Sequence, residues 1–338
     1  MLRRRLLLAS VILAGCAALL APALRAQQSA APGERAPKSS SGYLELTPRS
    51  WPFQFSALGD TRFSDPERSP EASFPHIRQS LLRRIAEEKH DFVVIAGDIV
   101  HKGASEYDWK NFDLERKIVG DAGVRIFPAL GNHDLEGGPV ELALKNYFAR
   151  FPELAGRRWY TVKYGPLLLL MLDSISGLDA GTPQGNWLRA WLADVPADVD
   201  YVVLVLHHPS YTRSTERFLG MFGGGHKARG QERRLAQLLE ERAKTLRAHV
   251  IQVAGHVHNY ERYLVNGVHY LVTGGGGSPA HLVDRLPQDF YSQEGVAFHL
   301  CRFTVDRDQF KFEMLRLQAL EDGNVWSVQD SFVLRPKP

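Results

Sequence analysis

The chain has 338 residues, of which 44% are apolar and 23% are charged, and this composition excludes a fibrous or a disordered chain. The formal net charge is +3, but the first 26 residues carry four arginines and no acid, so the remainder has a net charge near −1. We therefore expect no nucleic-acid-binding surface, and the length predicts one large domain with a sizeable core.

The chain begins with the pattern of an export signal. Three arginines precede an apolar run from Leu6 to Leu24 that contains no charged residue. A basic start, an apolar middle and small residues near a cleavage point are typical of secretory signal peptides. We predict that residues 1–26 form a signal peptide cleaved after Ala26, which places the mature protein in the periplasm or outside the cell.

Two alternatives remain for this segment. Residues 13–16 resemble a bacterial lipoprotein cleavage box, which would leave a lipid anchor on Cys16. The apolar run is also close to the ~20 residues that span a bilayer. Pro22 and the small, polar residues after the run disfavour a spanning helix, so we expect no transmembrane segment in the mature chain.

A change of composition marks the predicted start of the folded domain. Residues 27–50 are rich in Ala, Pro, Ser and Gln and show little apolar periodicity, which predicts a flexible tether. We therefore predict the folded domain at residues 51–338.

Short apolar segments alternate with helical stretches beyond Trp51. We predict strands at residues 53–58, 92–96, 124–130, 201–206 and 250–254. Between the first two, apolar residues recur at helical spacing at Ile77, Leu81 and Ile85. This alternation predicts an α/β fold. Further on, Asn266-Gly267 predicts a hairpin of residues 260–265 and 268–272.

Each of the five predicted strands ends in polar residues. In chain order they are Asp60; Asp98; Asn132, His133 and Asp134; His207 and His208; and His256 and His258. A glycine precedes four of these five groups and allows the backbone to turn sharply after the strand. The carboxyl ends of strands in an α/β sheet line one crevice, so we expect these side chains to converge.

The residue types at these strand ends indicate a metal centre. Carboxylates, an amide oxygen and imidazoles, with no thiolate, suit Fe, Mn, Zn or Co and disfavour a structural zinc site. The set is too large for one ion. Two ions about 3.5–4 Å apart, sharing one carboxylate, would use all of them.

This ordered set of motifs, above all GNHD followed by GHVH, resembles the calcineurin-like metallophosphoesterases and most of all their purple acid phosphatase branch. The resemblance covers residues 53–275. It implies a four-layer α/β/β/α sandwich of two mixed sheets, with a dinuclear metal site at the strand carboxyl ends. Residues 296–334 alternate like antiparallel strands, and we place them at the far edge of the second sheet rather than in a small appended layer.

The resemblance also implies a role for each motif residue. One ion would be held by Asp60, Asp98 and His258, and the other by Asp98, Asn132, His207 and His256. A metal-bridging hydroxide would attack the phosphorus of a phosphate ester. His133 would donate a proton to the leaving oxygen, and Asp134 would orient the His133 ring.

The first motif departs from the family pattern. Many members have Asp-x-His there, whereas this chain has Asp60-Thr61-Arg62. Purple acid phosphatases instead use a Tyr three residues after the bridging Asp, and His101 occupies that position. We predict that His101 completes the first site, so the iron-loaded protein should lack the purple tyrosinate band.

Two further side chains are predicted to contact the substrate. Arg62 is expected to bind phosphoryl oxygens, because its planar fork suits them, although a simple surface ion pair is an alternative. His208 is expected to contact the substrate or support the site, the alternative being an ordinary loop residue before Pro209.

The segment from 211 to 230 follows the His207 motif and should overhang the site. Its basic residues are Arg213, Arg217, His226, Lys227 and Arg229. We interpret it as a mobile substrate-binding loop, with a solvated insertion of no special role as the alternative.

The leading functional prediction is an exported phosphatase that hydrolyses phosphate monoesters. The same metal core would also serve a phosphodiesterase acting on nucleotides or lipid headgroups. A non-catalytic binding module on the same fold is a third reading, which the retention of Asn132 and His133 disfavours.

Overall fold

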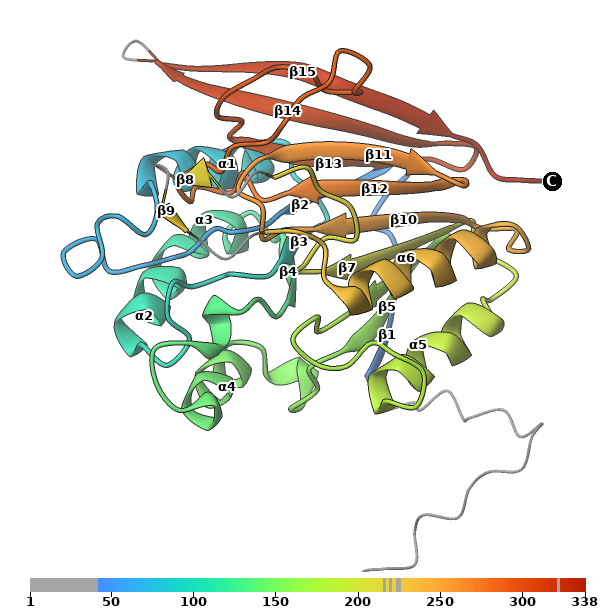
Figure 1. Cartoon of the computed structure of the whole chain (residues 1–338), viewed down its shortest axis with the longest axis horizontal. Helices are drawn as coiled ribbons and strands as arrows, with labels where there is room; N and C mark the ends of the chain where they lie inside the picture. The colour runs from blue at the N-terminus through green and yellow to red at the C-terminus, as the bar shows by residue number, and fades with distance from the viewer. Residues whose placement is uncertain (1–41, 215–216, 219–220, 223–225, 321–322) are drawn as a thin grey trace, which may run out of the picture. The chain divides into compact units, whose positions relative to one another are not determined.

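The structure is a computed structural model and describes residues 42–338, apart from 215–216, 219–220, 223–225 and 321–322 (Figure 1). The predicted signal peptide and the predicted lipid anchor at Cys16 lie outside these residues. The elements described below all belong to one compact unit, residues 38–338. In the described part of the chain, no helix combines the length and the apolar character needed to cross a membrane.

Two mixed sheets form the centre of this unit. The seven-stranded sheet has the order β1 (Tyr43–Leu46), β5 (Tyr160–Tyr164), β6 (Leu167–Met171), β7 (Tyr201–Leu206), β10 (His249–Ala254), β12 (Val268–Thr273) and β11 (Tyr260–Val265). The six-stranded sheet has the order β15 (Gly323–Leu334), β14 (Phe310–Leu320), β13 (His299–Val305), β2 (Phe53–Leu58), β3 (Phe92–Ala96) and β4 (Arg125–Ala129). A small separate pair consists of β8 (Arg217–Phe218) and β9 (Met221–Phe222).

The alternation of side chains along β7 explains how the sheets pack. Tyr201, Val203 and Val205 belong to a core that also contains Phe55 and Phe303 of the six-stranded sheet, whereas Val202, Leu204 and Leu206 belong to a second core. Successive side chains of a strand point to opposite faces, so a strand buried on both faces is a continuous apolar run.

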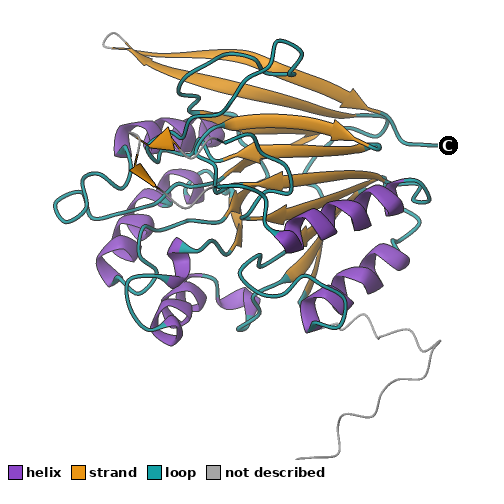
Figure 2. Cartoon of the chain, in the orientation of Figure 1, coloured by secondary structure: helices purple, strands orange, loops and turns teal. Residues whose placement is uncertain are grey.

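Helices cover the outer faces of both sheets (Figure 2). The second core is completed by Leu188 of α5 (Pro183–Ala193) and Leu235 of α6 (Gly230–Ala243). Beside the six-stranded sheet lies α1 (Pro75–Glu87), which buries Ile77 and Leu81. The other helices are α2 (Glu106–Glu115), α3 (Lys117–Gly120) and α4 (Val140–Arg150). The four-layer α/β/β/α architecture is therefore confirmed.

Most of the predicted strands are present. The five motif-bearing segments are β2, β3, β4, β7 and β10, and Asn266-Gly267 joins β11 to β12. The C-terminal strands extend the six-stranded sheet, since β13 pairs with β2 and is followed by β14 and β15, which form its far edge as predicted.

Two parts of the architecture differ from the sequence-based expectation. The predicted tether, residues 27–50, contains β1, which pairs in parallel with β5, so the folded domain begins before Trp51. Leu44 and Leu46 of β1 pack against the core, and this tertiary contact outweighs the weak local pattern. The antiparallel pair β5–β6 was not predicted, although the apolar run of β6 after Gly165-Pro166 could have indicated it.

Candidate metal centre

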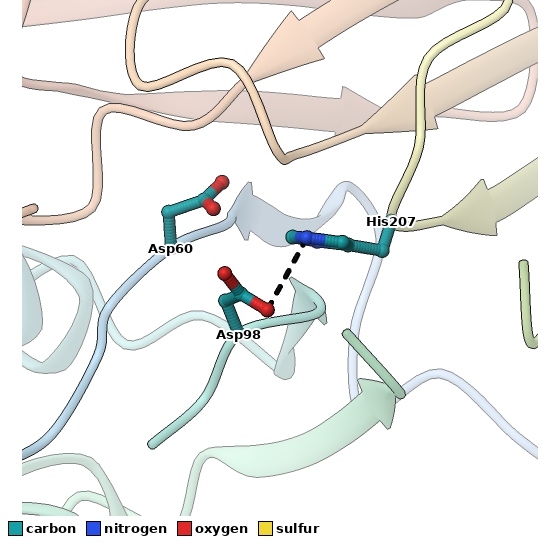
Figure 3. A group of neighbouring side chains, drawn as sticks. All are labelled: Asp60, Asp98 and His207. Atoms are coloured by element: carbon teal, nitrogen blue, oxygen red, sulfur yellow. Dashed lines mark ion pairs between the residues drawn. The ribbon is translucent and has the colours of Figure 1, made fainter. Parts of the chain in front are cut away.

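Three predicted ligands from two sheets meet at one point. Asp60 follows β2, Asp98 follows β3 and His207 follows β7. They are buried, and each offers a ligand atom such that these atoms all lie within 4.8 Å of one another (Figure 3). The site therefore lies where the carboxyl ends of strands from the two facing sheets come together.

Glycines of the motifs allow this close approach. Gly97 has a φ of 81°, and a Cβ atom there would lie 2.5 Å from the His207 ring. A Cβ at Gly131 would lie 2.1 Å from the backbone nitrogen of Asp98. Both distances are far below van der Waals contact, so only glycine fits, and the motif glycines are explained by the crowding of the strand ends.

The atoms around His207 fit a bound cation. Its Nε2 lies 3.1 Å from Asn132 Oδ1, 3.2 Å from Asp98 Oδ1 and 3.2 Å from His256 Nδ1. His207 Nδ1 lies 2.9 Å from the carbonyl oxygen of Ala96, which can only accept, so a neutral His207 ring has its proton on Nδ1 and a lone pair on Nε2. Four electron-pair donors thus converge, as a metal ion requires.

A second set of donors lies around Asp60. His258 Nδ1 donates to the carbonyl oxygen of Pro279 at 2.7 Å, which leaves a lone pair on Nε2. This Nε2 is 3.3 Å from Asp60 Oδ1, and both atoms are buried without a hydrogen-bond partner among the described residues. The other carboxylate oxygen of Asp60 accepts from the His256 backbone N–H at 2.8 Å. Two buried acceptors facing each other also fit a bound cation.

Burial and neighbouring charges shift the pKa values of these groups, and a bound cation would offset the rise at Asp60. Burial raises the pKa of Asp60 to about 7. Burial would also raise the pKa of Asp98, but His207, Arg62 and His133 outweigh it and hold this pKa well below its usual range. Burial lowers the pKa of His256 and that of His258, so both rings are neutral at pH 7, the form that binds metals.

His133 lies at the open side of the centre. Its side chain is 18% exposed, and Nε2 lies 4.0 Å from Asp98 Oδ2. Nδ1 faces the carbonyl oxygen of His101 at 2.8 Å, so this carbonyl sets the direction of the ring. We expected Asp134 to orient the His133 ring. The Asp134 carboxylate instead accepts from the backbone N–H groups of Val100 at 3.1 Å and Gly131 at 2.8 Å. Asp134 is fully buried and therefore holds the GNHD loop, not the ring.

The other predicted site residues, His101, Arg62 and His208, occupy different surroundings. The His101 ring stacks on that of His133 at 5.3 Å between centroids, and its buried Nδ1 has no hydrogen-bond partner among the described residues. Burial, with His133 and Arg62 nearby, lowers the pKa of His101 to about 4. Arg62 donates to Asp98 Oδ2 from Nε at 3.3 Å and from Nη2 at 3.2 Å. His208 Nδ1 lies 2.9 Å from Ser174 Oγ, and its ring is 4.3 Å from that of His256.

Two histidines beside the centre were not predicted to act on the ligands. His226 Nδ1 lies 3.3 Å from His256 Nε2, and the His281 ring stacks on that of His258 at 3.9 Å. His226 belongs to the segment 211–230, of which the structure describes only a part. Within that part, Arg213 pairs with Asp289. No local sequence motif marks either histidine, because both reach the site from loops outside the strand-end pattern.

A buried arginine supports the first motif. Arg78 of α1 is fully buried, forms a two-point ion pair with Glu115 and donates to the carbonyl oxygen of Thr61 at 3.2 Å. We expect Arg78→Met to lower the free energy of unfolding by roughly 3–5 kcal/mol, because Glu115 loses its partner in a poorly solvated place.

Chemical denaturation checks this prediction. Arg83→Met, on the exposed side of the same helix, is the matched control and should change the free energy of unfolding by less than ~0.5 kcal/mol. Equal stability of the Arg78 variant and the unchanged protein would contradict the importance of this ion pair.

Two packed mixed sheets with carboxylate, amide and imidazole donors converging at their strand ends define a metal-binding α/β domain. Sequence comparison is more specific. The family model described as "Calcineurin-like phosphoesterase" matches residues 59–260, more than half of the chain, and the protein belongs to this family.

The curated relatives include purple acid phosphatases. "Purple acid phosphatase 21" of Arabidopsis thaliana is 26% identical over 262 residues, covering 72% of this chain and 54% of the relative. "Phosphoenolpyruvate phosphatase" of Allium cepa is 25% identical over 269 residues, covering 72% and 52%. "Probable inactive purple acid phosphatase 1" of Arabidopsis thaliana is 24% identical over 279 residues, covering 73% and 43%. The chain thus spans about half the length of these relatives.

Solved structures show the same fold. The purple acid phosphatase PPD1 of yellow lupin superposes with a TM-score of 0.64 at 20% identity, covering 85% of this chain and 55% of the lupin chain. The structure of PhoD gives a TM-score of 0.57 at 14% identity, covering 87% and 72%.

Proposed function

We propose that this protein is a metal-dependent hydrolase of phosphate monoesters. The observation that carries the proposal is the convergence of electron-pair donors on His207 Nε2. Beside it lie two buried acceptors, on Asp60 and His258, that have no hydrogen-bond partner in the part of the chain that the structure describes. Relatives named as phosphatases, one of them for the monoester phosphoenolpyruvate, favour a monoester over a diester.

The ligands divide into two overlapping groups. We assign Asp60, Asp98 and His258 to one ion, with His101 as a further ligand, and Asp98, Asn132, His207 and His256 to the other; Fe, Mn, Zn or Co would suit these donors. Such ions lower the pKa of a water molecule and offset negative charge on phosphoryl oxygens. Asp98 is the shared ligand, because it lies against residues of both groups.

The chain's own residues would complete the reaction. His133 Nδ1 donates to the His101 carbonyl oxygen, so Nε2 carries a proton when the ring is doubly protonated, and this Nε2 proton would be delivered to the leaving oxygen of the ester. Arg62 is half-buried beside Asp98 and would turn its free donors toward phosphoryl oxygens. His208, neutral because burial lowers its pKa to about 2, would contact the substrate from the other side.

Hydrolysis of chromogenic substrates tests the proposal. The protein is stripped with a chelator, reloaded with Mn, Fe, Zn or Co, and assayed with a phosphomonoester and a phosphodiester of the same chromophore. We expect metal-dependent turnover that favours the monoester. A preference for the diester would make phosphodiesters the substrate class. A folded, metal-loaded protein that is inactive on both substrates would favour a binding module, as the relative named inactive suggests.

We also propose that the protein is exported, on the basis of residues 1–26 alone. Mass spectrometry of the protein made by a bacterium tests this. A mature chain that begins at Gln27 supports cleavage after Ala26, whereas a lipid-modified chain that begins at Cys16 supports the anchor. An intact N-terminus would contradict both.

A further inference from the structure

Three of the four histidines assigned as ligands, His207, His256 and His258, differ in what holds their second ring nitrogen. His207 Nδ1 lies 2.9 Å from the carbonyl oxygen of Ala96, and His258 Nδ1 lies 2.7 Å from that of Pro279. Both rings are therefore oriented by main-chain acceptors. His256 is different, because its Nε2 faces the Nδ1 of another side chain, His226, at 3.3 Å. Ligating histidines as a rule donate their other ring N–H to a fixed acceptor.

The direction of the hydrogen bond between His256 and His226 follows from which ring nitrogens carry a proton. His256 Nδ1 is the atom that faces the other donors, 3.2 Å from His207 Nε2, so it is the atom that would bind a metal ion. A ligating nitrogen carries no proton, and the neutral His256 ring therefore has its proton on Nε2. His256 Nε2 then donates and His226 Nδ1 accepts, which puts the proton of a neutral His226 ring on its own Nε2.

His226 is itself held by a stack of rings. Its ring lies on that of His281, with centroids 3.9 Å apart and planes inclined by 25°. The His281 ring lies in turn on that of His258 at 3.9 Å, and His281 Nδ1 accepts from the His258 backbone N–H at 3.2 Å. The His226 ring that faces His256 is therefore held in place by His281, which itself packs on His258 of the same GHVH motif.

A second contact ties the start of the same segment to the loop that contains His281. The carbonyl oxygen of Arg213 accepts from the Asp284 N–H at 3.0 Å, and Ser214 Oγ donates to the carbonyl oxygen of Leu282 at 3.2 Å. The described part of the segment 211–230 therefore meets the 281–289 loop at two places, at Arg213–Ser214 and at His226.

We propose that His226 is a positioning residue of the metal centre: it accepts the Nε2 proton of His256 and so presents His256 Nδ1 to the second metal ion. The inference rests on the proposed function. It assigns to the segment 211–230 a role in metal binding besides the predicted contact with the substrate.

Two variants of nearly equal shape test this role. Asn places Oδ1 where His has Nδ1 and keeps an acceptor, whereas Leu has a similar branched shape and no acceptor. We expect His226→Leu to bind the second equivalent of Co²⁺ about 10–100-fold more weakly, measured by equilibrium dialysis of the full chain, and His226→Asn to stay close to the unchanged protein. His76→Ala, an exposed histidine on α1, is the control and should bind both equivalents normally.

The outcomes separate the inference from the proposed function. Unaltered Co²⁺ affinity in His226→Leu, or equal weakening in the Leu and Asn variants, would overturn the inference and leave the metal centre intact. If the Leu variant does not fold, the Asn variant decides: near-normal binding supports the role, and clear weakening contradicts it. An unchanged protein that binds no Co²⁺ would overturn the metal centre together with the inference.

Discussion

Replacing Asp98 with Asn should remove at least one metal equivalent per chain and lower kcat by at least ~10²-fold. Loss of a group that merely orients a ligand already costs about 10–100-fold, and Asp98 is a charged ligand assigned to both ions. The side chain is fully buried, and its Oδ1 lies against His207 Nε2 and the His133 backbone N–H, while Oδ2 lies against Arg62.

This substitution removes charge and changes little else. Asn has the shape of Asp and tolerates the left-handed backbone of this position, where φ is 50°. Metal content by elemental analysis and kcat on the phosphomonoester are the measurements. Asp121→Asn, at an exposed helix end, is the control. Two tightly bound ions in the Asp98 variant would show that this carboxylate is not the shared ligand.

The second large effect is expected for His133→Ala, which should lower kcat by ~10²–10⁴-fold while metal content stays unchanged. The backbone N–H of residue 133 donates to Asp98 Oδ1 at 3.0 Å, and alanine keeps this contact. Nε2 of the ring lies 4.0 Å from Asp98 Oδ2, and Nδ1 contacts His101 through its main-chain carbonyl oxygen rather than through its ring nitrogens. Removal of the His133 ring should therefore affect proton transfer and leave the metal ions in place.

A series of phosphomonoesters with different leaving groups distinguishes proton donation from a general loss of structure. An ester whose leaving oxygen is weakly basic needs little protonation, so the variant should lose less activity on it than on an alkyl ester. An equal loss across the series, or loss of metal from the variant, would contradict the role of His133 as proton donor. His76→Ala again serves as the unaltered reference.

Much of this site could be predicted because its chemistry follows strands that are recognisable locally. The segments of β2, β3, β7 and β10 are short apolar runs, and the polar residues come directly after each run. The rule that strand carboxyl ends of one sheet share a crevice places Asp60 and Asp98 together, whereas His207 joins them from the facing sheet, and the ligand atoms of all three lie within 4.8 Å of one another. Gly97 and Gly131 mark the same turns in the sequence.

The remaining features depend on contacts between segments that no local pattern links. Strand β1 is stabilised by pairing with β5, more than one hundred residues away along the chain, so its composition alone resembles a tether. The position of Asp134 next to His133 in the sequence suggested that its carboxylate orients the His133 ring. In the fold this carboxylate instead accepts from the N–H groups of Gly131 and of Val100, which belongs to another segment.

The sequence by itself determined the α/β class, the motif-bearing strands and the residue types of the metal centre, because strand formation and sharp turns are set by neighbouring residues. Only the tertiary structure decided which acceptor meets each ring nitrogen: Ala96 for His207, Pro279 for His258 and His226 for His256. Hydrogen bonds form over about 3 Å between groups far apart in the chain, so their pairing exists only after the sheets and loops have packed.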